Sequence, residues 1–147
     1  MNKVIINSPT LADVDTLWMW GQENWELWGD PETKWYTKES LRIWIQNPRD
    51  DVLLVARISD SLVGLCFTCN LRSWSYCAGL YVDKAYRKLG LGKQLVEKTS
   101  ELMFKKGIRE IVFLADLKNK SGIDFYRKVG CKEGFKFLWM YKSFKKE

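Results

Sequence analysis

The sequence contains no histidine, and it has only three prolines and four cysteines among its 147 residues. The absence of histidine excludes catalysis by a Ser-His or Cys-His pair. No apolar run approaches the roughly 20 residues that a membrane-spanning helix needs. The first ten residues, MNKVIINSPT, also lack the apolar core of a secretory signal. We therefore expect a globular cytoplasmic protein without a membrane partner.

Two of the cysteines, Cys66 and Cys69, have the spacing of a metal-binding pair. The surrounding residues, LVGLCFTCNL, favour a strand, on which positions three apart point to opposite faces. The sequence offers no histidine ligand and no second cysteine pair with zinc spacing. We therefore expect no metal site, and we expect the thiols to be reduced and partly buried.

The net charge of +6 is divided unevenly along the chain. Residues 1–74 carry 7 basic and 10 acidic side chains, a net charge of −3, whereas residues 75–147 carry 17 basic and 8 acidic side chains, a net charge of +9. Opposite signs favour two ligands of opposite charge, although lysines that merely solubilise the surface would give the same totals. A nucleic-acid partner is not expected, because the lysines gather around the glycine-rich turn described below.

Hydrophobic periodicity predicts one domain, residues 1–147, in which short strands and helices alternate. The expected elements are a strand at 3–7, a helix from about 11 that is broken at 29–31, a helix from 37 to before Pro48, a hairpin turning at 60–61, a strand at 76–82, a helix at 90–106, a strand at 109–115, a helix from 119 or 121 to 129, and two short strands within 131–144. This order predicts an α/β fold of the α+β type. We expect a mixed, mostly antiparallel sheet of six to seven strands, flanked by about four helices.

The segment YRKLGLGKQL, residues 86–95, places two glycines and three basic residues where a strand gives way to a helix. Such a turn offers backbone N–H groups and the positive end of a helix to an anion, typically a phosphate. It is not a P-loop, because Gly92-Lys93 is followed by Gln94. It is not a dinucleotide fingerprint either, because Leu95 stands where a third small residue is required.

Residues 87–92, Arg-Lys-Leu-Gly-Leu-Gly, have the form Arg/Gln-x-x-Gly-x-Gly. This form resembles the acyl-CoA-binding signature of the GNAT superfamily of N-acetyltransferases. Residues 80–83 resemble the end of that family's central strand, and NKSGIDFYRKVGC, residues 119–131, resembles its second signature. The resemblance implies a GNAT-like fold and a transferase that moves an acetyl group from acetyl-CoA, its cosubstrate, to a primary amine of a small molecule or a peptide by direct nucleophilic attack.

The resemblance also implies roles for individual residues. The N–H groups of residues 88–93 would hold the pyrophosphate of acetyl-CoA, and residues 80–82 would offer a strand edge to its pantetheine arm. Tyr126 would act as the general acid that protonates the departing thiolate, and Asn119 would either bind the pantetheine or cap its helix. The expected cofactor-binding residues are Leu80, Tyr81, Val82, Arg87, Lys88, Leu89, Gly90, Leu91, Gly92, Lys93, Asn119 and Phe125.

The sequence departs from the family pattern at three places. Gly122 replaces the usual alanine and Cys131 the usual phenylalanine, and both are packing positions. Neither position where some family members carry a glutamate base has a carboxylate here, because one lies within SWSYCAG and the other is Leu114. Asp116, which shares strand parity with Leu114, is a candidate base. Glu23, Glu26 and a relay through water are the alternatives.

Six of the eight tryptophans lie between residues 18 and 44, together with several acidic side chains. An aromatic and acidic wall suits a cationic amine, through cation–π contacts and ion pairs. The alternative is that these indoles pin the first two helices to the sheet, as expected for Trp18 and Trp44. The expected substrate-binding residues are Glu23, Trp25, Glu26, Trp28 and Trp35.

The identity of the acceptor is left open by the sequence. A polyamine or an amino sugar suits the acidic first half, and a protein N-terminus is suggested by the second signature but opposed by the missing glutamate. A non-catalytic acyl-CoA-binding or regulatory module of the same fold is the competing function. The sequence does not fix the oligomeric state, and a homodimer is one option.

Overall fold

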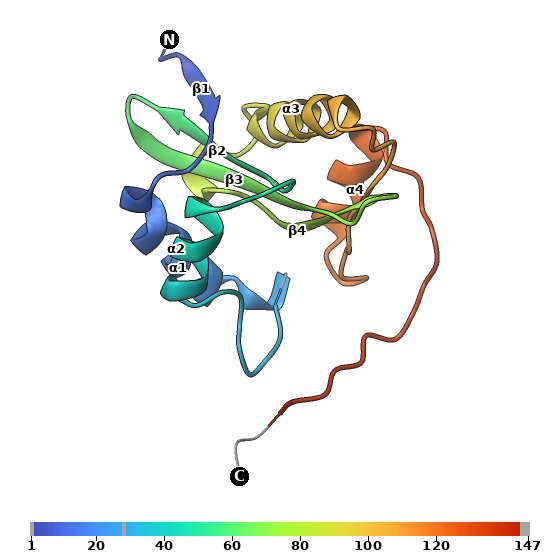
Figure 1. The fold of residues 1–147 in the computed structure, drawn as a ribbon. Coiled ribbons are helices and arrows are strands. Elements are labelled where there is room, and N and C mark those ends of the chain that lie inside the picture. Colours follow the sequence, from blue (N-terminus) through green and yellow to red (C-terminus); the bar gives the residue numbers. More distant parts are fainter. Residues whose placement is uncertain (1, 28, 145–147) are drawn as a thin grey trace.

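The computed structural model describes residues 2–27 and 29–144, and a five-stranded sheet in the order β1-β2-β3-β4-β5 lies at its centre (Figure 1). The elements are β1 (Val4–Asn7), α1 (Val14–Glu23), α2 (Lys38–Gln46), β2 (Val52–Ile58), β3 (Ser61–Asn70), β4 (Ser75–Val82), α3 (Leu91–Lys105), β5 (Ile111–Val112) and α4 (Lys120–Lys128), with 3-10 turns at Leu11–Asp13, Trp25–Leu27 and Lys84–Tyr86. Strands β1 to β4 are antiparallel, and β5 runs parallel to β4. The predicted α+β fold with a mixed, mostly antiparallel sheet is confirmed, although five strands form rather than six or seven.

Helices cover both faces of the sheet (Figure 1). On β2, Leu53 and Val55 pack into a core with α1 and α2, whereas Leu54 and Ala56 pack into a second core with α3. This division explains why β2 and β3 are nearly continuous apolar runs, since a strand that is covered on both faces has no solvent side. None of the helices in the described ranges is long and apolar enough to cross a bilayer.

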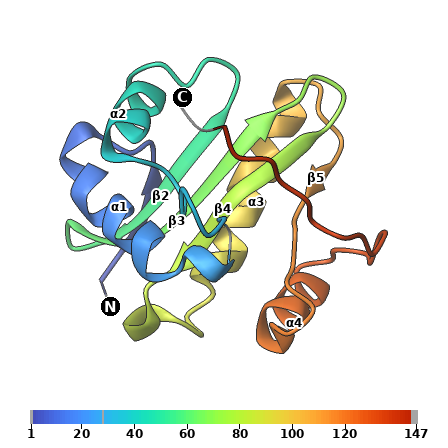
Figure 2. The ribbon, with the colours of Figure 1, turned by 90° about the horizontal axis from the view of Figure 1, so that it is seen from below.

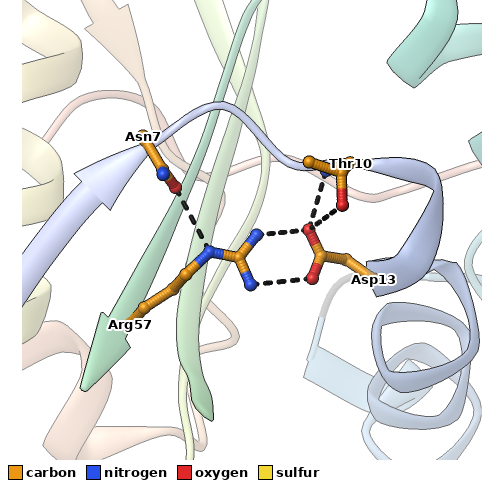
Figure 3. A network of polar contacts seen from close by, with 4 residues as sticks. All are labelled: Asn7, Thr10, Asp13 and Arg57. Atoms are coloured by element: carbon orange, nitrogen blue, oxygen red, sulfur yellow. Dashed lines mark hydrogen bonds and ion pairs between the residues drawn. The ribbon is translucent and has the colours of Figure 1, made fainter. Parts of the chain in front are cut away.

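The second helix begins where its capping residue predicts, whereas the helix expected from about residue 11 starts as the 3-10 turn Leu11–Asp13 and becomes α-helical only at Val14. The Thr37 hydroxyl accepts a hydrogen bond of 3.1 Å from the Ser40 N–H and caps α2. Near the start of α1, the Arg57 guanidinium of β2 makes a two-pronged ion pair with the buried Asp13 carboxylate, which also accepts a hydrogen bond of 2.7 Å from the Thr10 N–H (Figure 3). This pair ties α1 to the sheet, and its bidentate form is the strong form of an arginine–carboxylate contact.

Strand β4 contains a bulge at Ala78. Phe67 of β3 is opposite Gly79 and Thr68 is opposite Cys77, so Ala78 has no partner across the ladder. The Trp35 indole donates a hydrogen bond of 3.1 Å to the Ala78 carbonyl. A bulge bends its strand and increases the local twist. The bend explains why β4 pairs with β5 only at its first two residues, before the bulge.

The C-terminal part of the chain differs from the prediction. The strand expected at 109–115 is reduced to Ile111–Val112, because β4 turns away from it beyond the bulge. The two strands expected within 131–144 do not form in the described residues. Residues 132–144, here called the C-terminal arm, run as an extended segment that leaves α4 and makes no ladder with the sheet (Figures 1 and 2). Strand propensity alone does not form a strand when the segment does not pair with a sheet edge.

Candidate functional site

The glycine-rich turn between β4 and α3 has the backbone shape of an anion site. Lys88 and Gly90 both adopt left-handed backbone conformations, with φ of 65° and 78°. Gly90 is the N-cap of α3, where it provides no side chain to cap the helix, and the space that a Cβ would occupy there is open. The first N–H groups of α3 therefore have no capping side chain and lie at the positive end of the helix.

The second motif meets the first at Gly92. A Cβ at Gly92 would lie 3.0 and 3.1 Å from two ring carbons of Phe125, and 3.9 Å from a methyl carbon of Val82. The start of α3, the end of β4 and the middle of α4 are therefore in direct contact. Gly92 is required for close packing rather than for an unusual backbone conformation, and the two segments predicted to bind the cosubstrate are brought together in space.

Two of the three cationic side chains of this segment, those of Arg87 and Lys93, lie differently. The Arg87 Nε donates a hydrogen bond of 2.9 Å to the Val82 carbonyl, and its guanidinium lies 5.4 Å from the centre of the Tyr81 ring. Arg87 therefore fixes the turn against the end of β4. The Lys93 ammonium lies 3.7 Å from a Glu97 carboxylate oxygen on the exposed face of α3, where both side chains are 63% exposed. Such an exposed pair is weak, so Lys93 is free to reorient toward an anion.

The residues predicted to lie beside the pantetheine, Leu80, Tyr81 and Val82, form the last part of β4. One edge of this part pairs with β3, whereas β5 reaches only Ser75 and Tyr76. Beyond the bulge, no strand in the described ranges lies on the second edge of β4. An extended amide-containing chain can pair with such an edge as an added strand does. The bulge that creates this edge was not predicted, and no sequence pattern around Ala78 signals it.

Tyr126 lies on α4, on the side that faces β5. Its ring centre is 4.9 Å from that of Phe113 and 5.5 Å from that of Phe125. Burial raises the pKa of Tyr126 well above its usual value, with a smaller contribution from Cys77 of β4. The phenol is therefore protonated throughout the neutral range, which is the state that a proton donor needs.

Asn119 caps α4. Its side-chain oxygen accepts a hydrogen bond of 3.1 Å from the Gly122 N–H. Of the two roles predicted for Asn119, binding the pantetheine or capping its helix, this contact corresponds to capping. A Cβ at Gly122 would lie 2.5 Å from the Asn119 amide nitrogen. The glycine that replaces the usual alanine therefore makes room for this position of the Asn119 side chain.

A pocket of about 280 Å³ opens between α1 and the end of β4. It contains Glu23, one of the predicted acceptor-binding residues, and Tyr81, one of the predicted cofactor-binding residues, whereas the other side chains around it were not predicted. The pocket is lined by Met19, Trp20, Glu23, Asn24, Tyr81, Asp83 and Lys84. The ring centres of Trp20 and Tyr81 lie 5.1 Å apart, so α1 packs directly on the strand that carries the candidate cosubstrate site. Helical spacing with Glu23 was the signal that could have identified Met19 and Trp20, which lie four and three residues before it.

The other predicted acceptor-binding residues are dispersed. Trp25 is half-buried and Glu26 exposed on the 3-10 turn after α1, and Trp28 lies outside the described residues. Trp35 is only 7% exposed, and its ring packs on Phe67 within the core. Burial gives no support to a direct contact between Trp35 and an acceptor, because a cation–π contact needs an accessible ring face. Its place beneath the bulge instead makes it a support for β4.

The strand-parity argument for Asp116 does not hold, because β5 ends at Val112. Asp116 lies in the exposed turn before α4, where its carboxylate accepts a hydrogen bond of 2.9 Å from the Lys118 N–H. Its backbone carbonyl accepts another from the Asn119 N–H, also at 2.9 Å. These contacts shape the turn that leads into α4 and place the carboxylate at its start.

Three of the four thiols lie in the sheet, those of Cys66 and Cys69 on β3 and that of Cys77 on β4, and Cys131 follows α4. The Cys66 and Cys77 sulfurs are 4.0 Å apart in the interior between β3 and β4, and the Thr99 hydroxyl of α3 contacts Cys66 at 3.4 Å. All four cysteines are free. No group of three or more metal-ligating side chains is found in the described ranges.

Comparison with known proteins identifies the fold. The model of the acetyltransferase (GNAT) family matches residues 17–131, which include both motifs and the pocket. The chain belongs to the acetyltransferase (GNAT) family. This confirms the predicted family, and with it the prediction of an acyltransferase whose cosubstrate is acetyl-CoA.

Two curated relatives are N-acetyltransferases. An uncharacterized N-acetyltransferase of Methanocaldococcus jannaschii is 27% identical over 107 residues, which are 68% of this chain and 45% of that protein. The chain thus spans less than half the length of that relative. The spermidine N(1)-acetyltransferase of Thermoplasma acidophilum is 25% identical over 148 residues and is matched over 86% of this chain and 87% of its own.

Two solved structures have a similar fold. The PaiA N-acetyltransferase of Thermoplasma acidophilum in complex with coenzyme A superimposes with a TM-score of 0.77 at 25% identity, over 88% of this chain and 90% of its own. An aminoglycoside acetyltransferase from an uncultured soil metagenomic sample, in complex with trehalose, has a TM-score of 0.76 at 20% identity. That match covers 97% of each chain.

Proposed function

We propose that this protein transfers the acetyl group of acetyl-CoA to a primary amine of a small cationic acceptor, of the polyamine or aminoglycoside kind. The observation that carries the proposal is the contact between Gly92 and Phe125, beside the part of β4 that β5 does not reach. It brings the glycine-rich turn together with α4, the helix that bears Tyr126, and it supports an anion-binding role for the turn. Acetyl-CoA suits that arrangement, because its extended pantetheine chain joins a diphosphate to a thioester.

The cosubstrate follows the backbone in this proposal. The N–H groups of residues 88–93 hold the diphosphate, with Arg87 and Lys93 adding positive charge. The pantetheine arm lies along Leu80 to Val82 and pairs with the main chain there. A β4 N–H at this edge polarises the thioester carbonyl and stabilises the oxyanion that develops on attack. Asn119 serves the site by fixing the start of α4, and Phe125 by packing on the turn.

The reaction needs three proton transfers. The ammonium first loses one proton to a carboxylate or to water. The free amine nitrogen then attacks the thioester carbonyl carbon, the C–N bond forms, and the C–S bond breaks. The departing thiolate takes the phenolic proton of Tyr126, which burial keeps protonated. The second proton, which the attacking nitrogen loses as it becomes an amide, passes through water and restores the phenol of Tyr126. Glu23 in the pocket and Asp116 at the start of α4 are the two carboxylates that we test for this role.

The acceptor is assigned by charge. The pocket beside β4 is lined by two acidic side chains, Glu23 and Asp83, and one basic side chain, Lys84, which together give it one excess negative charge. The first half of the chain has a net charge of −3. An acidic entrance attracts a polycation and disfavours an anionic acceptor. The names of two relatives, a spermidine acetyltransferase and an aminoglycoside acetyltransferase, support the same class of substrate. Trp25 and Glu26, on the adjoining turn, are proposed to border the entrance.

The test is an acceptor panel with the purified full chain. Acetyl-CoA is mixed with spermidine, with an aminoglycoside or with a peptide bearing a free N-terminus, and released thiol and product mass are both measured. We expect kcat/KM to be at least about tenfold higher for one of the polycations than for the peptide. A preference for the peptide would contradict the assigned acceptor class while leaving acetyl transfer intact.

The competing function, a non-catalytic acyl-CoA-binding module, is distinguished by the same preparation. Such a module binds acetyl-CoA with measurable heat but releases no thiol that depends on an acceptor.

The base is identified by comparing the variants Glu23→Gln and Asp116→Asn with the active wild-type enzyme. The variant that lowers kcat and removes the acidic limb of the pH profile identifies the base, and unchanged profiles in both variants would assign the proton to water.

A further inference from the structure

Two thiols and two hydroxyl groups meet inside the core between the sheet and α3. They belong to Cys66 and Thr68 of β3, Cys77 of β4 and Thr99 of α3, here called the thiol cluster. Cys66, Thr68 and Thr99 are completely buried, and Cys77 is 7% exposed. Polar groups buried this deeply pair with one another, and each member of the cluster contacts at least one other.

The Cys66 sulfur is the centre of the thiol cluster. It accepts a hydrogen bond of 3.4 Å from the Thr99 hydroxyl, and it lies 3.8 Å from the Thr68 hydroxyl oxygen and 4.0 Å from the Cys77 sulfur. The hydrogen bond with Cys77, together with those from the two threonines, lowers the pKa of Cys66 despite its burial. The same bond raises the pKa of Cys77. Because the thiolate is the nucleophilic form, Cys66 is the attacking sulfur of the pair.

The two sulfurs lie on either side of the bulge in β4. Cys66 is opposite Leu80 and Cys77 is opposite Thr68, so a bond between the sulfurs would join two rungs of the ladder across Ala78. A disulfide is about 2.0 Å long, so the sulfurs need to approach by about 2 Å. Ala78 has no partner on β3, so β4 can adjust there without losing a pair of the ladder.

The thiol cluster is reached from the side of Cys77. This residue directly follows Tyr76, the last residue of β4 that pairs with β5, and it keeps some exposed surface where Cys66 has none. An opening this narrow admits a small uncharged oxidant and excludes a large thiol reagent. Hydrogen peroxide is an oxidant of that kind, and it reacts with thiolates.

We propose that Cys66 and Cys77 are a site of reversible oxidation, at which hydrogen peroxide converts the two thiols into a disulfide that lowers acetyl transfer. The Cys66 sulfur attacks a peroxide oxygen, the O–O bond breaks, and a sulfenic acid and one water result. The Cys77 sulfur then attacks the sulfenic sulfur, the S–S bond forms, and a second water leaves. The thiols lose two electrons and two protons, which the peroxide takes up. A dithiol reductant reverses the change by exchange.

The effect on activity follows from the position of the bond. Leu80, the rung opposite Cys66, begins the part of β4 along which the pantetheine arm is proposed to lie. Drawing Cys77 toward Cys66 shifts this part of the strand and misaligns the arm, so the KM for acetyl-CoA rises. This effect rests on the proposed function, whereas formation of the disulfide does not.

The first test detects the disulfide directly. A Cys69→Ser, Cys131→Ser chain retains only the two thiols of the cluster. It is treated with hydrogen peroxide while folded, and free thiols are then capped with N-ethylmaleimide in denaturant. Trypsin cleaves after Arg72, so the disulfide joins the peptides 58–72 and 73–84. We expect this linked pair in most molecules, and we expect dithiothreitol to remove it. Two capped cysteines after peroxide treatment would overturn the proposal.

The second test measures the consequence for acetyl transfer. In the same background, peroxide is expected to lower kcat/KM for acetyl-CoA at least about fivefold, and dithiothreitol is expected to restore it. Cys77→Ser is expected to keep its activity within about twofold under the same treatment. A linked peptide with unchanged kinetics would refute the control of activity. An untreated chain without acetyl transfer would refute the proposed function, and the linked peptide would still report on the thiol pair.

The role of Cys66 as the attacking sulfur has a separate test that keeps both thiols. Thr99→Val has nearly the same shape but removes the hydroxyl that donates to Cys66. It is expected to slow the appearance of the linked peptide at least about threefold. Thr37→Val, at the start of α2 and away from the cluster, is the control and is expected to leave that rate unchanged. Equal rates in the two variants would contradict activation of Cys66 by the cluster.

Discussion

Tyr126 combines two properties at the level of a single residue: its phenol faces the β5 side of α4, and burial keeps it protonated. As the donor to the leaving thiolate, it is expected to contribute to kcat and not to cosubstrate binding. A thiol with a pKa near 8.5 leaves readily even without a proton. The rate contribution of Tyr126 is therefore expected at the low end of the range for general-acid catalysis. Tyr126→Phe is expected to lower kcat about 10²-fold and to change the KM for acetyl-CoA less than about threefold, measured by thiol release.

The matched control is Tyr36→Phe. Tyr36 is half-buried beside Trp35 and Trp44, and burial raises its pKa as it does that of Tyr126. It lies in the core with α1 and α2, so the same chemical change there is expected to leave kcat within about twofold. Because the raised pKa keeps Tyr126 protonated, wild-type kcat is expected to show no loss from its ionisation up to about pH 9. Equal losses of kcat in both variants would refute the acid role.

The ion pair between Asp13 and Arg57 leads to a prediction about the stability of the fold. Burial opposes ionisation of Asp13, but hydrogen bonds from Arg57 and Thr10 outweigh it and hold the pKa of Asp13 below its usual value. Asp13→Asn leaves the half-buried guanidinium without its partner and is expected to lower the free energy of unfolding by about 2–3 kcal/mol at pH 7. Urea denaturation measures the difference.

The pH dependence of this contribution has a definite sign. A carboxyl group whose pKa is depressed in the folded state stabilises the protein above its unfolded pKa, near 3.9, and loses that effect as the pH falls through the folded value. The stability difference between wild type and Asp13→Asn is therefore expected to be constant above about pH 5 and to shrink below pH 4. A difference that stays constant down to pH 3 would contradict the assignment.

At the scale of elements, the glycine at each end of α3 allows a matched comparison. Gly90 and Gly107 both have left-handed backbones, with φ of 78° and 85°, and both have open space where a Cβ would lie. An alanine costs about 1 kcal/mol of stability at either position, because L side chains disfavour this conformation. Only Gly90→Ala disturbs the turn that receives the diphosphate. We expect it to raise the KM for acetyl-CoA about 5- to 10-fold, while Gly107→Ala leaves that KM unchanged. Equal KM values for acetyl-CoA in the two variants would show that the turn does not contribute to acetyl-CoA binding.

Elements with local signals were predictable from the sequence, and elements fixed by distant contacts were not. Thr37 marks the start of α2, and glycines mark both ends of α3, because capping depends on neighbouring residues. The bulge at Ala78 is contacted by Trp35, which is 43 residues away in the sequence, and β4 pairs with β5 only before the bulge. The pocket beside β4 was missed for the same reason, since its walls come from α1 and from the end of β4.

The C-terminal segment shows this limit most clearly. Its alternating apolar residues correctly indicate strand propensity, and the sequence accordingly predicts two strands within 131–144. Pairing, however, depends on where an edge lies, and the arm makes no ladder with either edge of its own sheet. A sequence specifies the hydrophobic pattern of a strand locally, but its partner is a property of the assembled fold.

The division of charge predicts a behaviour of the whole molecule. If the acidic first half attracts the acceptor and the basic second half attracts acetyl-CoA, salt should weaken both interactions, but through different side chains. Glu23→Gln is expected to raise the KM for spermidine about 3- to 5-fold at low salt, an effect that disappears at high salt, with the KM for acetyl-CoA unchanged. Steady-state kinetics at two ionic strengths measures this, with Glu39→Gln on the exposed side of α2 as the control. A salt-independent effect would point to a contact other than charge.

The divergence of β4 and β5 has a consequence for the protein when acetyl-CoA is absent. The open margin of β4 then resembles the growing end of a fibril, where a neighbouring molecule can add its own backbone. The cosubstrate would shield this margin, so its supply would govern colloidal behaviour as well as turnover. Light scattering on warming should show that aggregation begins at a lower temperature without acetyl-CoA than with it. Identical onset temperatures would mean that this edge of β4 is already protected.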